Sequence, residues 1–409
     1  MNASNQTNFW LRFSIFNLFI VAVLGTLMRY KIAYSLPWLD QKHLQEAHSH
    51  FAFYGWVSQI LYVLLVEYLR PRVKLLKLRK YQVVLGVNAF GALLMIPTFL
   101  YGGYYSLSII ASSICLFSGM VILGFLVWDL RSFKDILARW FLAGLSLAAF
   151  SSLGVFTLSY IRASGLNDQN LYLASTYFYL HFQYNGCFIL MAIGFFIDHL
   201  RKIGVDLTSR EHNVIFYTML FGAIVGYGLS VLWLELPLWV YGLIVVSAVV
   251  QSYGAVRLFQ WVRKNWSPIV LNFSSLQRFV LFYVAFAFVV KMALQLFSVV
   301  PAISQFAFGF RNVVIAYLHL VLLMLLTVFL VNQILALNQF QMTKWVKFFL
   351  KSVLLFIFLN EAVLGLMGLL SIKYIAIPYT AQALLLISIG IALSVLGLFL
   401  SLKVKNKVL

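Results

Sequence analysis

The sequence predicts an all-α membrane protein: twelve transmembrane helices in three pseudo-repeated four-helix arcs, with both termini in the cytoplasm. Composition, the spacing of the apolar segments and the distribution of Lys and Arg predict this fold class. Of the 409 residues, 63% are hydrophobic and 10% are charged, whereas a soluble domain carries about 25% charged residues. The net charge of +19 is spread through short connecting segments and forms no basic stripe, so nucleic acid is not an expected partner.

An α-helix needs about 20 apolar residues to cross the hydrocarbon core of a bilayer. The connections between the apolar segments are too short for a second, soluble domain, so we expect residues 1–409 to form a single polytopic transmembrane domain in contact with lipid. Most prolines lie at or outside the segment ends, where a missing backbone N–H costs little. The twelve segments are residues 12–30, 47–69, 81–101, 105–128, 138–160, 172–198, 213–234, 237–261, 276–299, 312–336, 346–370 and 377–402.

Lys and Arg set the orientation of the helices, because the cytoplasmic connections of membrane proteins are enriched in both residues. With the N-terminus inside, the cytoplasmic segments hold 23 of the 30 Lys and Arg residues, and the opposite segments hold 6. The remaining one, Lys291, lies within an apolar segment. This asymmetry predicts a multi-pass protein with cytoplasmic termini, and we expect it in the bacterial inner membrane.

Histidines recur in every fourth predicted helix. His48 and His50 lie near the start of the second helix, His181 lies in the sixth and His319 in the tenth. The separations of 131 residues from His50 to His181 and 138 residues from His181 to His319 indicate a threefold repeat. If the second helix begins near Asp40, a residue type favoured at helix N-caps, all four imidazoles lie in one layer of the outer leaflet.

An imidazole inside a bilayer is costly and by default indicates a functional site. Each histidine could instead hydrogen-bond a neighbouring helix, but their recurrence on three helices at one depth favours ligands. Neutral imidazole is the usual nitrogen ligand of haem iron and copper. The other histidines are expected outside this layer, with His43 in an outer loop and His199 and His212 on the solvated surface of a cytoplasmic loop.

Twelve helices with histidines on the second, sixth and tenth resemble the catalytic subunit of haem–copper oxidases and nitric oxide reductases. In that superfamily the second and tenth helices supply the axial histidines of a low-spin haem, and the sixth supplies a copper ligand. The resemblance maps His319 to this haem and places Tyr317 where the ligand of a high-spin haem is expected. Because residues 213–234 lack the adjacent His-His pair of the seventh helix, we do not expect a complete haem–copper centre.

The stretch from His48 to Gly55 also resembles the second-helix signature of NnrS, a twelve-helix haem-binding family linked to nitric oxide metabolism. That signature is His-x-His followed by Gly five residues after the second His, and the spacing here is the same. The resemblance implies a b-type haem bound by His319 and one of His48 and His50, and it implies His181 as a candidate copper ligand. Residues two apart on a helix point about 200° apart, and the sequence leaves the choice between His48 and His50 open.

Other polar residues lie at the same predicted depth. Tyr184 follows His181 on one helix face, as either a proton and electron donor or a helix-packing hydrogen-bond donor. Lys291 and Glu361 are catalytic candidates, with Lys291 facing a haem propionate or Glu361 relaying protons, unless they form a buried ion pair. Arg311 at the outer end of the tenth helix is either a propionate ligand or an interfacial anchor.

These observations are compatible with two functions. The favoured one is a haem-binding membrane protein with a bis-histidine haem between the second and tenth helices. It would act in electron transfer or nitric oxide chemistry with a membrane or periplasmic electron-donor subunit, and any enzyme activity would be that of an oxidoreductase. The alternative is a proton-coupled transporter that uses the His, Lys and Glu layer. The absence of Gly/Pro breaks from the second, sixth and tenth helices favours the first function, because many transporter sites lie at broken helices.

Overall fold

The computed structural model describes residues 3–74, 76–132, 135–371, 373–375 and 377–405. These residues are helical apart from connecting turns and one isolated β-bridge between Phe340 and Val404. Within them, 12 helical spans are long and apolar enough to cross a membrane. The prediction of an all-α protein with twelve spans is therefore confirmed.

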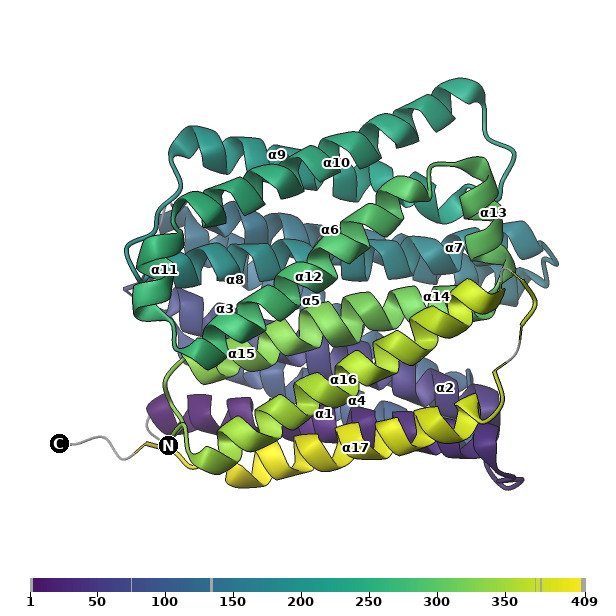
Figure 1. Cartoon of the computed structure of the whole chain (residues 1–409), viewed down its shortest axis with the longest axis horizontal. Coiled ribbons are helices and arrows are strands. Elements are labelled where there is room, and N and C mark those ends of the chain that lie inside the picture. Colours follow the sequence, from purple (N-terminus) through teal and green to yellow (C-terminus); the bar gives the residue numbers. More distant parts are fainter. Residues whose placement is uncertain (1–2, 75, 133–134, 372, 376, 406–409) are drawn as a thin grey trace. The chain divides into compact units, whose positions relative to one another are not determined.

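The chain divides into two compact units, and unit 1 comprises Met1–Phe133 and Thr327–Leu409. Its long helices lie side by side (Figure 1). Its elements are α1 (Ala3–Ala33), α2 (Gln41–His50), η1 (Phe51–Ser58), α3 (Gln59–Leu69), α4 (Leu78–Gly102), α5 (Ser106–Asp129), η2 (Leu130–Ser132), α15 (Val328–Ala336), α16 (Lys344–Ser371) and α17 (Thr380–Ser401).

Unit 2 comprises Lys134–Leu326, and the chain returns to unit 1 within η5 (Leu320–Thr327). Its elements are α6 (Ala138–Ser164), α7 (Gln169–His181), η3 (Phe182–Phe188), α8 (Ile189–Arg201), α9 (Ser209–Val225), η4 (Gly226–Val231), α10 (Leu238–Lys264), α11 (Trp266–Asn272), α12 (Ser275–Phe297), α13 (Pro301–Gly309) and α14 (Arg311–His319).

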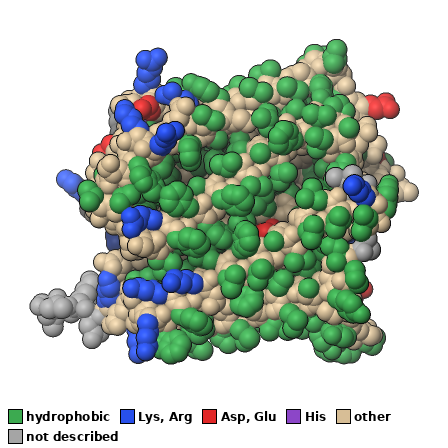
Figure 2. All heavy atoms as spheres, viewed as in Figure 1, with side chains coloured by type: hydrophobic (Ala, Val, Ile, Leu, Met, Phe, Trp, Pro, Cys, Tyr) green, Lys and Arg blue, Asp and Glu red, His purple; other side chains and the backbone are tan. Residues whose placement is uncertain are grey.

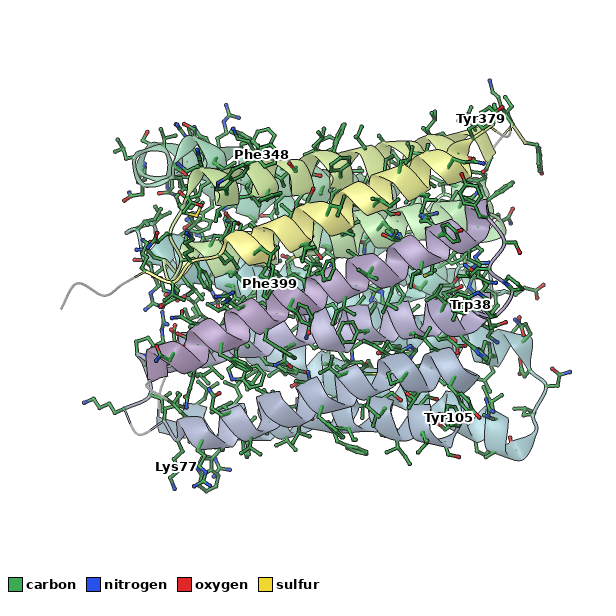
Figure 3. All side chains as sticks on the ribbon, turned by 90° about the horizontal axis from the view of Figure 1, so that it is seen from below. Trp38, Lys77, Tyr105, Phe348, Tyr379 and Phe399 are labelled. Atoms are coloured by element: carbon green, nitrogen blue, oxygen red, sulfur yellow. The ribbon has the colours of Figure 1, made fainter. Side chains whose placement is uncertain are left out.

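The two ends of unit 1 differ in composition. The start of α1 and the end of α17 lie together, because the Arg12 guanidinium is 5.5 Å from the ring centre of Phe399. Lys and Arg side chains gather where α16 begins and α17 ends (Figure 2). Figure 3 places Trp38 and Tyr105 at the end of the unit opposite Lys77. Basic residues concentrated at one end of the spans are typical of helices that cross a membrane, and Trp and Tyr are typical of either membrane interface.

Side-chain caps define where several spans begin. The Asp40 carboxylate accepts hydrogen bonds from the backbone N–H groups of Lys42 and His43, at 2.8 and 2.9 Å. This cap confirms the predicted start of the second span, so His43 lies in the first turn of α2 and not in a loop. The same chemistry starts other helices, with caps at Asp168, Thr208 and Ser274.

The predicted surface positions of His199 and His212 are wrong. His199 lies in α8, half-buried, with its ring centre 5.2 Å from that of Phe273. His212 lies in α9 and is only 1% exposed. The polar residues before it resemble a loop in the sequence, but Thr208 and Glu211 form a capping box that starts α9 at this point.

Candidate functional site

Three spans change from α-helical to π-helical geometry directly after a histidine. In the second span η1 follows His50, in the sixth η3 follows His181, and in the tenth η5 follows His319. Each of these spans is one continuous helix, as the absence of Gly/Pro breaks predicts, but the sequence did not predict the π segments within them. π-helical turns are found frequently at functional sites.

Buried amide side chains hold η1 in its π-helical geometry. A π segment leaves main-chain carbonyls without their usual helical partner, and in a membrane such groups need another donor. Asn88 of α4 donates through Nδ2 to the Tyr54 carbonyl at 3.1 Å, and Asn17 of α1 donates to the Gly55 carbonyl at 2.6 Å. Gly55 is required here for a further reason, because a Cβ at this position would overlap the Phe51 ring.

His50 is half-buried and has three contacts within unit 1. Its Nδ1 lies 2.9 Å from the carbonyl oxygen of Glu46, and a carbonyl can only accept, so Nδ1 carries the hydrogen. Its Nε2 then has the lone pair and accepts from the Tyr104 hydroxyl at 2.8 Å. The imidazole also stacks on Phe99, with ring centres 4.5 Å apart.

His48 points toward α1. Its Nδ1 lies 3.1 Å from the carbonyl oxygen of Val21, which makes Nδ1 the donor and Nε2 the nitrogen with the lone pair. Gly25, one turn further along α1, faces the same imidazole so closely that a Cβ there would lie 3.1 Å from Cε1. The ring of His48 is therefore oriented by the backbone of a neighbouring helix, in the manner of imidazoles that bind metals.

Two ionisable side chains of unit 1 extend this region. Arg29 lies one turn beyond Gly25 on α1, on the same helix face, and is half-buried. It is within Coulombic range of the half-buried Glu361 of α16, whose carboxylate accepts from the Asn360 amide at 3.0 Å. Arg29 was not among the candidates predicted from the sequence, because it was counted among the outer connecting segments.

His319, in unit 2, has the same local hydrogen bond as His50 has in unit 1. Its Nδ1 lies 2.9 Å from the carbonyl oxygen of Ile315, four residues earlier, so that Nε2 has the lone pair. No residue of α14 is fully buried, and Arg311, its first residue, is exposed. The role expected for Arg311 stays a prediction.

His181 has the opposite tautomer. Its Nε2 donates to the Ala223 carbonyl of α9 at 2.8 Å, and its Nδ1 accepts from the Asn185 amide at 3.3 Å. Both nitrogens of this buried ring are thus used within unit 2. Tyr184, also buried, packs edge-to-face on Tyr317 with ring centres 6.4 Å apart. These contacts favour the helix-packing roles of His181 and Tyr184.

Lys291 is fully buried in α12 and has amide partners. Its ammonium donates to Gln295 Oε1 at 2.7 Å, and Gln295 Nε2 donates in turn to Gln251 Oε1 of α10 at 2.7 Å. Among the described residues, every ion pair of unit 2 uses other side chains. Lys291 and Glu361 therefore each have hydrogen-bond partners in their own unit, and their catalytic roles stay predictions.

The candidate histidines differ in the metal or cofactor that they could bind. The oriented imidazole of His48 in unit 1 and that of His319 in unit 2 each suit one axial position of a haem, which needs only axial nitrogen ligands. Copper needs several ligands, and no group of three or more His, Cys, Asp or Glu side chains that could hold a metal ion occurs in the described part of the chain. The described residues therefore do not fit a copper site at His181.

Comparison with known proteins adds no relative. No protein-family model matches the chain, and no curated protein matches it.

Proposed function

We propose that this chain is a haem-binding membrane protein related to the haem–copper oxidases, and that His48 is the iron ligand from the second span. The observation that carries the proposal is the orientation of the imidazole, with Nδ1–H donated to the Val21 carbonyl and Gly25 facing the ring edge. This hydrogen bond fixes the tautomer that presents Nε2, the nitrogen with the lone pair, to a metal.

His48 is favoured over His50 by what surrounds each ring. The Nε2 of His50 already accepts from Tyr104, and its ring face is covered by Phe99. Ligation by His50 would require both contacts to break. His48 instead faces the helix that also carries Arg29, a cation suited to a haem propionate or to Glu361. His319 is the second axial ligand that the sequence resemblance implies.

We also propose how the helices are grouped and on which side of the membrane the termini lie. The recurrence of a histidine followed by a π segment in every fourth span supports three four-helix arcs. The charged end of unit 1, at which α1 starts and α17 ends, supports termini in the cytoplasm of a bacterial cell. When bound, a haem would supply one-electron transfer for an electron-transfer or nitric-oxide-related role, and the two histidines would bind and orient it.

The test is a reduced-minus-oxidised optical spectrum of the full-length chain, purified from a haem-replete host, with haem quantified by extraction. We expect a b-type spectrum that is lost in His48→Ala and kept in His50→Ala, the matched control. His319→Ala should convert a low-spin spectrum to a high-spin one. A wild-type protein without haem would refute the proposal. Haem lost in His50→Ala and kept in His48→Ala would refute the ligand assignment alone.

One observation favours the transporter alternative. Lys291, His181 and Gln295 form a buried polar cluster beside Gly226, where α9 changes to the 3₁₀ segment η4, and broken helices often carry transport sites. A haem-free protein in which Lys291→Met abolishes proton-driven uptake into proteoliposomes would favour this function. A haem-loaded protein without uptake would exclude it.

A further inference from the structure

A small cavity lies at one end of unit 2, between the start of α9 and the end of α10. Its volume is about 240 Å³, and its lining combines charged and aromatic groups. Lys and Arg side chains gather over this end of the two helices (Figure 2). The lining residues are Glu211, Ile215, Arg257, Gln260, Trp261 and Lys264.

The lining follows one face of α10. Arg257, Trp261 and Lys264 are spaced by four and three residues, so they lie above one another on the helix surface. At 1.5 Å per residue these positions cover the last ~10 Å of the helix, and Lys264 is its final residue. The cavity is therefore at the level of the lipid headgroups, whichever side of the membrane this end faces.

The two cations of the cavity are not neutralised by direct contact. Glu211 is within Coulombic range of both Arg257 and Lys264, but its carboxylate accepts from the hydroxyl and backbone N–H of Thr208, at 2.8 and 3.2 Å. In the described part of the chain, no ion pair or hydrogen bond joins Arg257 or Lys264 to another side chain. A guanidinium and an ammonium thus face a cavity that holds one carboxylate.

We infer that this cavity binds the phosphate group of an anionic phospholipid. Arg and Lys are the usual ligands of phosphate oxygens, and the exposed Gln260 adds an amide donor. Trp261 forms a buried wall, with its indole N–H donated to the Asp206 carbonyl at 3.4 Å. A Trp beside basic residues at the end of a span is typical of the membrane interface, which identifies the lipid headgroup as the source of the phosphate.

The test measures lipid binding to the full-length chain in detergent by native mass spectrometry. Phosphatidylglycerol, phosphatidylcholine and inorganic phosphate are titrated separately. We expect selective retention of phosphatidylglycerol, weakened about five-fold in Arg257→Gln and again in Lys264→Gln, because each cation contributes about that factor at a membrane surface. Arg263→Gln is the matched control, since Arg263 lies in the same helical turn as Lys264 but does not line the cavity.

A third variant separates ligand binding from a structural role of the charges. Glu211→Gln removes the one carboxylate among the described residues that line the cavity, and Gln also suits the capping box with Thr208. We expect it to tighten phosphatidylglycerol binding several-fold. Equal binding in wild type, Glu211→Gln and the Arg257→Gln/Lys264→Gln pair would overturn the inference. If inorganic phosphate binds saturably and phosphatidylglycerol is not preferred over phosphatidylcholine, the lipid headgroup is refuted as the source of the bound phosphate.

Discussion

Replacing Asn88 by Leu tests how unit 1 maintains its π segment. The Asn88 amide donates two hydrogen bonds through Nδ2, to the Tyr54 carbonyl at 3.1 Å and to Gln59 Oε1 at 2.7 Å. Leu has a similar size but no donor, so both acceptors lose this partner inside the protein. We expect a loss of free energy of unfolding and a return of η1 toward α-helical geometry.

The magnitude depends on the number of groups affected. A buried acceptor left without a donor costs about 1–3 kcal/mol in soluble proteins, and interhelical hydrogen bonds in membranes average about 0.6 kcal/mol. Loss of the Asn88 carbonyl oxygen Oδ1, which has no hydrogen-bond partner among the described residues, offsets part of the cost. The expected destabilisation is therefore about 1–3 kcal/mol.

The assay is reversible unfolding in mixed micelles, followed by tryptophan fluorescence. Thr98→Val is the control on the same helix, because the Thr98 hydroxyl donates to Leu94 of α4 itself, at 2.7 Å. We expect this variant to change the free energy of unfolding by less than about 0.5 kcal/mol. If Asn88→Leu and Thr98→Val unfold with the same free energy, the amide does not hold the π segment, and the explanation of its geometry is refuted.

Three further predictions concern single contacts. Gly25→Val places a branched side chain against His48, so it should reduce haem content while the fold persists; unchanged haem content would contradict this. Trp140→Phe removes the indole N–H that donates to His212 at 2.9 Å, so it should lower the free energy of unfolding by about 1–3 kcal/mol. Adding His212→Phe removes the acceptor as well, so the double variant should recover part of this loss, which a double-mutant cycle measures. Hydrogen bonds from the α2 backbone lower the pKa of Asp40. The cap therefore stabilises the helix above the ordinary carboxyl pKa of about 4 and weakens as the pH falls through the lowered pKa, so acid should destabilise wild type more than Asp40→Asn; equal acid sensitivity would contradict this.

The sequence was sufficient for features that depend on local pattern. Apolar length predicted all twelve spans, and the side-chain chemistry of Asp40 predicted the start of α2. The π segments could not be predicted in this way. In η1, two carbonyls accept from Asn17 and Asn88, which lie 38 and 34 residues away in the sequence. Buried His212 was missed for a similar reason, because its partner Trp140 is 72 residues away.

The candidate site also depends partly on local pattern and partly on contacts between residues distant in the sequence. Spacing alone identified the histidines, but the two nitrogens of an imidazole are distinguished only by their partners. Val21 sets the tautomer of His48, and Ala223 sets the opposite one in His181. The sequence therefore left the choice between His48 and His50 open and made His181 a candidate copper ligand. Their hydrogen bonds favour His48 as a ligand and His181 as a link between helices.

The π segments themselves support a role for the histidines beyond crossing the membrane. One extra residue in a helical turn rotates the later part of the helix by about 100° relative to the earlier part. In the second span His48 faces α1, while Trp56 within η1 donates its indole N–H to Thr327 at 2.9 Å. Because two buried Asn donors and Gly55 accompany η1, and because a π segment recurs after His181 and His319, we infer that these interruptions serve to orient the imidazoles.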